Sequence, residues 1–165
     1  PFGNFLWAGV ISGIENVGIS KISTDQNLNV YLVGQFEGTV DLDPGPEIYP
    51  VTSNGEYDFY YAKLDINGDF EWAHAMGGAG YERGRTITND NFGNCYVAAE
   101  FEEVVDFAPG PEVENYTSMG YRDIAIQKIN EDGIVIWTKI ISSTAKQFVS
   151  DIICDETENL YLYFL

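Results

Sequence analysis

Residues 30–47 decide the fold, and they read VYLVGQFEGTVDLDPGPE. The first part is rich in Val, Tyr, Phe and Thr and has no helical stripe, so it predicts a β-strand over residues 29–40. The prolines of Pro44-Gly45-Pro46 cannot donate to a strand ladder, which predicts a rigid turn directly after the strand.

The same phrase returns at residues 95–112 as CYVAAEFEEVVDFAPGPE, and a third copy begins at residue 160. The spacing is 65 residues, both from Tyr31 to Tyr96 (96 − 31) and from Tyr96 to Tyr161 (161 − 96). A fixed period of this size indicates a repeat architecture. Two aromatic residues recur at the same position of every unit, which indicates a structural role in packing between units. They are the tryptophans Trp7, Trp72 and Trp137 and the tyrosines Tyr31, Tyr96 and Tyr161.

Each full unit is expected to contain four short strands. In the first unit they cover 18–25, 29–40, 58–65 and 69–76, and in the second 84–90, 94–105, 123–130 and 134–141. Four antiparallel strands per repeat predict an all-β fold of β-propeller-type blades that form an incomplete ring. The expected division is 1–12 as the last strand of a preceding blade, 13–77 and 78–142 as complete blades, and 143–165 as the first strands of a further blade. We expect one propeller domain that is a fragment of a longer chain.

Composition narrows the classes of function. Hydrophobic residues make up 45% and aromatic residues 15% of the chain, too many for a disordered protein. The net charge of −18 would repel a phosphate backbone, which argues against a nucleic-acid partner. No run of about 18 apolar residues is present, so membrane insertion is not expected. Cys95 and Cys154 have no metal-ligand spacing and are interpreted as small apolar residues within strands.

Three carboxylates suggest a metal site. Asp41 and Asp43 leave the second strand and Asp58 enters the third, so pairing of these strands would bring the three to the neck of one loop. Ca²⁺ binds clustered carboxylate and carbonyl oxygens of this kind. The alternative is that the carboxylates accept hydrogen bonds from loop N–H groups. In the second unit Ala108 replaces the counterpart of Asp43.

The long loops 41–57 and 106–122 should emerge at one rim of the fold, where a rigid scaffold usually carries its binding residues. We expect a protein or glycan partner at this rim. No catalytic motif is present, and the single histidine, His74, lies in the middle of a strand, where a structural role is expected. Arg83 and Arg85 are expected either to pair with neighbouring acids or to hold an anionic group.

Three runs carry a resemblance to a known family: Phe36 to Gly45, Asp58 to Trp72, and Asp90 to Val97. They resemble the SBBP-type bacterial β-propeller repeat, which is typical of secreted and surface proteins of Bacteroidetes-like bacteria. The resemblance implies the propeller fold and an exported protein, and it implies no defined activity. The second unit departs from the pattern at Ala108 and at Glu103-Val104, which replaces Gly-Thr.

These observations predict a non-catalytic extracellular structural or binding module with a role in adhesion or as a scaffold. The alternative is a carbohydrate-binding or carbohydrate-active propeller whose active residues lie elsewhere. The exposed edges of the fold are expected to contact remaining blades of the parent chain or another copy.

Overall fold

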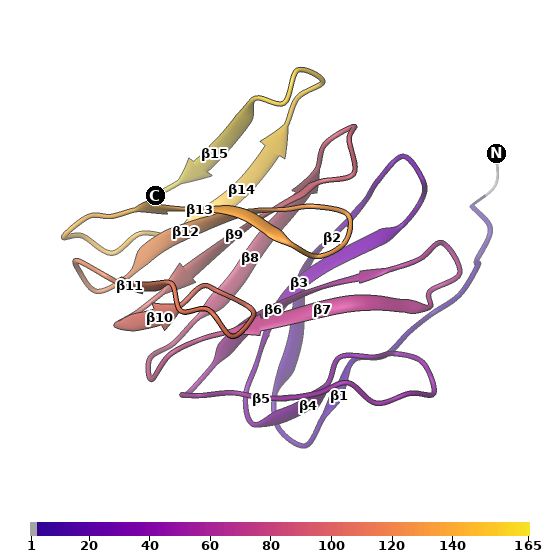
Figure 1. Cartoon of the computed structure of the whole chain (residues 1–165), viewed down its shortest axis with the longest axis horizontal. Helices are drawn as coiled ribbons and strands as arrows, with labels where there is room; N and C mark the ends of the chain where they lie inside the picture. Colours follow the sequence, from indigo (N-terminus) through magenta and orange to yellow (C-terminus); the bar gives the residue numbers. More distant parts are fainter. Residues whose placement is uncertain (1–2) are drawn as a thin grey trace.

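The computed structural model describes residues 3–165 and is built from strands, with no helix among the described residues. Two four-stranded antiparallel sheets lie side by side, with a pair of strands beyond them (Figure 1). The first sheet, blade 1, contains β2 (Val17–Thr24), β3 (Val30–Phe36), β6 (Asp58–Leu64) and β7 (Phe70–Met76). The second, blade 2, contains β8 (Arg83–Asn89), β9 (Cys95–Phe101), β12 (Asp123–Ile129) and β13 (Val135–Ile141). The last pair is β14 (Val149–Cys154) and β15 (Leu160–Phe164).

The strand order shows that each blade is a meander in which every strand pairs with the next strand of the same sheet along the chain. Blade 1 has the order β2-β3-β6-β7, and blade 2 has the order β8-β9-β12-β13. The all-β, propeller-type prediction is therefore confirmed. The first strands β2, β8 and β14 lie next to one another, which places them on the inner side of the fold. The last strands β7 and β13 lie on the outer side.

The hydrophobic core lies between the blades. One cluster joins Tyr31, Val33, Phe59 and Tyr61 of blade 1 to side chains of blade 2, and a second joins blade 2 to β14 and β15. Strands β6 and β9 are buried along their whole length. Blade 1 and the β14–β15 pair cover the two faces of β9, whereas β6 lies between blade 2 and side chains of the N-terminal segment and of the segment between β3 and β6. Stacking of repeats therefore buries apolar surface that a single sheet would leave in water.

The expectation about the second strand of each unit needs correction. The expected second strand, 29–40, is broken: β3 ends at Phe36, and a short β4 (Thr39–Asp41) follows Gly38, whose φ is +67°. Within the long loop, β4 pairs with β5 (Pro50–Thr52) in a short ribbon that the sequence did not predict. Blade 2 repeats this ribbon as β10 (Val104–Asp106) and β11 (Asn115–Thr117), with Glu103 at a φ of +56° in place of Gly38.

The expected last strand of a preceding blade, 1–12, also differs from the structure. Residues 1 and 2 lie outside the described residues, and no strand is assigned over residues 3–11. The short strand β1 (Ser12–Gly13) pairs with β4 instead. A strand needs a partner ladder, and the described residues offer the stretch 3–11 none. Residues 3–165 contain no helix that is long and apolar enough to cross a bilayer.

Candidate functional site: a groove between two blades

The tight turns of the fold share one hydrogen-bonding pattern. In the turn after β2, Asp25 Oδ1 accepts hydrogen bonds from the backbone N–H groups of Asn27 and Asn29. Its Oδ2 accepts hydrogen bonds from the side-chain amide of Asn29 and the hydroxyl of Tyr31. The turns that begin at Asp90 and Asp155 repeat this pattern, including the tyrosine hydroxyl at 3.0 and 3.1 Å. The repeated aspartates thus fix the turns, as their side-chain chemistry predicts.

The repeated tryptophans connect one blade to the next. The indole N–H of Trp72 donates to the carbonyl of Glu131 in blade 2 at 3.0 Å, and Trp7 donates to Ile66 at 3.0 Å. The indole of Trp72 also lies against Gly133, whose φ is +84°, so a side chain at this position would be strained and would meet the ring. In residues 3–165 the indole N–H of Trp137 has no such carbonyl partner.

The predicted calcium ligands take part in separate hydrogen-bonded turns. Asp41 Oδ1 accepts the N–H groups of Asp43 and Tyr49, and Asp43 Oδ1 accepts that of Gly45 at 2.6 Å. Asp58 Oδ2 accepts the N–H of Asn54 at the other end of the loop. No group of three His, Cys, Asp or Glu side chains within residues 3–165 is arranged to hold a metal ion. These contacts fit the alternative of hydrogen-bonded loops, and calcium binding stays a prediction that a chelator would test through the melting temperature.

The sequence did not reveal a buried charge cluster between blade 2 and β14. Glu100 is fully buried and pairs with Arg122 at 3.0 Å and with Arg85 at 3.2 Å. It also accepts the backbone N–H of Val149 in β14. Arg85 therefore pairs with an acid, while Arg83 lies over the ring of Tyr81 at 4.4 Å. The contact of Arg85 fits the expected pairing with an acid, and anion binding by Arg83 stays a prediction.

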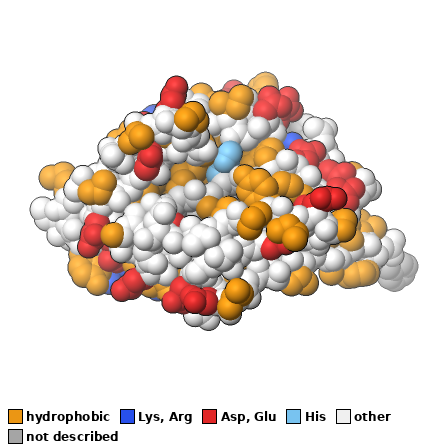
Figure 2. Space-filling model, turned by 60° about the horizontal axis from the view of Figure 1, so that its bottom comes forward, with side chains coloured by type: hydrophobic (Ala, Val, Ile, Leu, Met, Phe, Trp, Pro, Cys, Tyr) orange, Lys and Arg blue, Asp and Glu red, His pale blue; other side chains and the backbone are white. Residues whose placement is uncertain are grey.

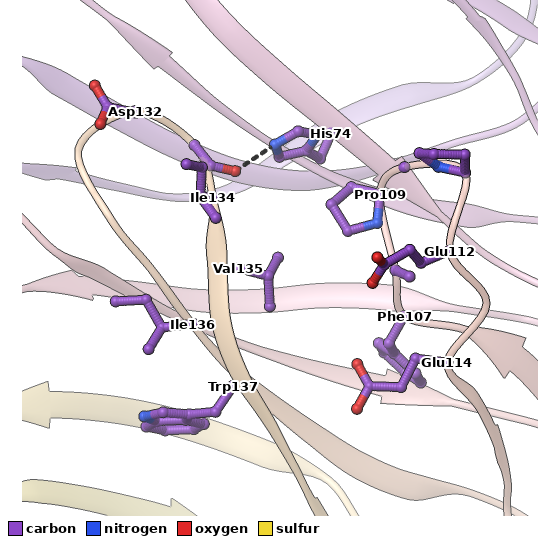
Figure 3. Close-up of a pocket in the computed structure, with 14 residues that line it drawn as sticks. His74, Phe107, Pro109, Glu112, Glu114, Asp132, Ile134, Val135, Ile136 and Trp137 are labelled. Carbon is purple, nitrogen blue, oxygen red and sulfur yellow. Dashed lines mark hydrogen bonds between the residues drawn. The ribbon is translucent and has the colours of Figure 1, made fainter.

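A groove opens on the outer side of the fold between the loop 107–114 and strand β13 (Figure 2). Its cavity has a volume of about 540 Å³. Phe107, Val135 and Trp137 provide apolar lining, and Pro109 lies on the loop wall opposite His74 (Figure 3). Ile134 and Ile136, which also line it, are 61% and 52% exposed. The groove is therefore an apolar surface open to solvent.

Carboxylates surround this apolar lining. Among the lining residues that the structure describes, Glu112, Glu114 and Asp132 are acidic and none is Lys or Arg. Glu114 accepts hydrogen bonds from the hydroxyls of Tyr116 at 2.8 Å and Thr138 at 3.3 Å, so its carboxylate has a fixed position. A groove of this kind favours a ligand that combines apolar and cationic groups.

His74 closes one end of the groove. Its Nε2 lies 2.7 Å from the carbonyl of Gly133, so this nitrogen carries the proton and donates it. The ring stacks on Trp72, and burial lowers the pKa of His74 below its ordinary value. A neutral imidazole that joins β7 to the turn of the next blade has a structural role, as the sequence predicted.

The sequence predicted binding at the long-loop rim but did not predict the groove itself. The signal was present as departures from the repeat: Tyr49 becomes Glu114, Phe70 becomes Val135, and Gly9 becomes His74. The groove combines residues that repeat, such as Pro109 and Glu112, with residues that change between units, and the changed residues are what distinguish it from blade 1.

Comparison with known proteins gives one distant similarity and no family. No protein-family profile matches the chain. The chain is 21% identical over 182 aligned residues to an uncharacterized WD repeat-containing protein, L264, of Acanthamoeba polyphaga mimivirus. The match covers 95% of this chain and 13% of the relative's length.

Proposed function

We propose that this chain is a non-catalytic, repeat-based binding module that presents its outer groove and long-loop rim to a polypeptide partner. The observation that carries the proposal is the groove between β13 and loop 107–114, which combines exposed apolar side chains with carboxylates on a rigid two-blade support. The similarity to a protein named for its WD repeats supports a repeat-based scaffold.

Two further parts of the proposal rest on the sequence. The resemblance to SBBP-type repeats supports an exported, cell-surface or secreted protein with a role in adhesion or assembly. The contacts of two residues that could serve acid–base or anion chemistry support the proposal of a non-catalytic role. His74 is engaged with Gly133, and Arg85 is engaged with Glu100.

A carbohydrate-binding propeller is the second candidate. Apolar and aromatic side chains beside carboxylates also suit a sugar, whose faces stack on rings and whose hydroxyls bind carboxylate oxygens. The groove favours a polypeptide because its apolar wall is aliphatic, with Val135, Ile134 and Ile136 along β13. In addition, β13 is an outer edge strand that can accept an extended chain.

A paired screen tests the proposal. The immobilised folded chain is exposed to a displayed library of random peptides and, separately, to a glycan array, with heat-unfolded chain as the control. We expect peptides to be enriched only by the folded chain. Enrichment of glycans alone would favour the carbohydrate candidate, and turnover of chromogenic glycoside or peptide substrates would contradict a non-catalytic module.

A further inference from the structure

Blade 1 shows what fits the groove of blade 2. At the position equivalent to Glu114, blade 1 carries Tyr49, because 49 + 65 = 114. The ring of Tyr49 packs against Phe70 with a centroid distance of 5.0 Å, and its hydroxyl donates to the carbonyl of Ala73 on β7 at 3.2 Å. Blade 1 therefore fills the space between its loop and its outer strand with its own aromatic ring.

Blade 2 has no ring at the equivalent positions. Its counterparts of Tyr49 and Phe70 are Glu114 and Val135, and the space between loop and outer strand is the open groove. The residue at the end of the groove also differs between the two blades. In blade 1, Pro44 lies so close to Gly9 that an added Cβ would come within 2.9 Å of it, whereas blade 2 has His74 at the equivalent place.

The charge at the groove also changes. Asp69 and Glu71 of blade 1 become the exposed Ile134 and Ile136, which makes the outer strand more apolar. The remaining charges that line the groove, Glu112, Glu114 and Asp132, are negative. An aromatic group alone would satisfy the apolar lining but leave the carboxylates without a counter-charge.

We infer that the groove of blade 2 binds an aromatic side chain of a partner polypeptide that carries Lys or Arg next to that ring. The ring takes the place that Tyr49 takes in blade 1, between Phe107 and Val135, and a tyrosine hydroxyl donates to the carbonyl of Thr138, the counterpart of Ala73. The basic neighbours pair with Glu112 and Asp132 at the rim. This inference rests on the proposed function and specifies the chemistry of its ligand.

Competition among defined peptides tests the inference on the full chain. The probe is a fluorescein-labelled peptide with one tyrosine flanked by lysines, measured by fluorescence polarisation. We expect saturable binding that weakens about tenfold when the peptide tyrosine is replaced by alanine, since burying an aromatic ring contributes at least that factor. Replacing the flanking lysines by glutamate should abolish binding.

The decisive variant restores the internal ring. Glu114→Tyr with Val135→Phe copies the blade 1 pair into blade 2 and should reduce binding at least about tenfold, because the ring site is then filled. A retained circular dichroism spectrum and melting transition show that the variant is folded. Glu112→Gln with Asp132→Asn should weaken binding about threefold and reduce its salt dependence, whereas Glu47→Gln, the blade 1 counterpart of Glu112, should leave it unchanged.

Three results would overturn the inference: equal binding by the wild-type and ring-filled proteins, equal binding of the tyrosine and alanine peptides, or an oligosaccharide that binds the groove when the peptide does not. The first result would mean that lysine peptides are attracted only by the overall charge of −18. If random peptides are enriched but still bind the ring-filled variant, the proposed binding module stands and the groove assignment fails. If no peptides are enriched at all, the proposed function fails first.

Discussion

In blade 1 the ring of Tyr49 lies against Phe70 and fills the space under the long loop, whereas blade 2 has Glu114 and Val135 at these positions and an open groove. The strands around this space are otherwise equivalent, from the β6–β7 pair to the β12–β13 pair. The repeat thus keeps the positions that stack and orient the blades, and it varies the positions that face outward beneath the loop. A repeat fold can in this way acquire a binding surface in one unit without changing its neighbours.

The largest expected effect concerns the tryptophans that join the blades. Trp72→Ala should lower the free energy of unfolding by about 3 kcal/mol, because the indole packs on Tyr31 and Tyr61 and donates to Glu131. Trp137→Ala should cost less than half as much, because no following turn covers that indole in the described residues. Urea denaturation of both variants measures the difference. Equal losses would show that contact with the next blade is not what makes Trp72 important.

The second expected effect is a pH dependence of stability that comes from Glu82, a buried carboxyl directly before β8. Glu82 is fully buried and accepts the N–H groups of Gly78 and Glu102 at 2.8 and 3.4 Å. Burial raises the pKa of Glu82 to about 7. Between about pH 4.5 and pH 7, the folded state therefore keeps a proton on Glu82 that the unfolded state has released. The contribution of Glu82 to the free energy of unfolding consequently falls as the pH rises through this range.

Glu82→Gln should remove this dependence. The amide keeps an acceptor for Gly78, and Gln147 already occupies the equivalent position before β14. Above pH 7 the variant should be more stable than the wild type, by on the order of 2 kcal/mol, and near pH 4.5 the two should differ little. Thermal melts between pH 4 and pH 8 test this. A difference that does not change with pH would rule out titration of Glu82 in this range.

The third expected effect concerns the equivalent turns that begin at Asp90 and Asp155. Asp90 is buried, and although its burial acts to raise its pKa, the hydrogen bonds from Asn94, Phe92 and Tyr96 lower the pKa overall. Asp90→Ala should therefore destabilise the protein by about 2 kcal/mol at pH 7. The wild-type contribution is lost as the pH falls through the lowered pKa. Asp155→Ala removes the same bonds from an exposed turn and should cost about half as much, which pH-dependent melting would show.

Much of this fold could be predicted because the same sequence pattern occurs in two complete units. The 65-residue period, the strand pattern and the Asp-led turns each follow from local chemistry that recurs at Tyr31 and Tyr96. The broken second strand was missed because its break depends on a positive φ that Gly38 adopts easily and Glu103 adopts against its preference. The groove was missed for a different reason. It depends on a few positions that differ between units, above all Glu114 on the loop and Val135 on β13, and their effect appears only once the fold brings the loop beside the strand.

The smallest expected effect concerns the hydroxyl of the ring that fills blade 1. Tyr49→Phe keeps the ring against Phe70 and removes the hydrogen bond to the carbonyl of Ala73. Because Tyr49 is 39% exposed, water can take over part of the lost bond, and the free energy of unfolding should fall by only about 0.5 kcal/mol. Tyr49→Ala, which also removes the ring, should cost about 2 kcal/mol.

The pair of variants separates the two contributions that a partner's tyrosine would make in blade 2. If the ring supplies most of the energy in blade 1, a phenylalanine peptide should bind the groove of blade 2 nearly as well as a tyrosine peptide. If Tyr49→Phe proves as damaging as Tyr49→Ala, the hydroxyl dominates, and the groove should then discriminate strongly between the two peptides. Urea denaturation of the Tyr49 variants and polarisation titrations of the two peptides should therefore rank ring and hydroxyl in the same order. Opposite rankings would mean that the groove of blade 2 does not reproduce the ring site of blade 1.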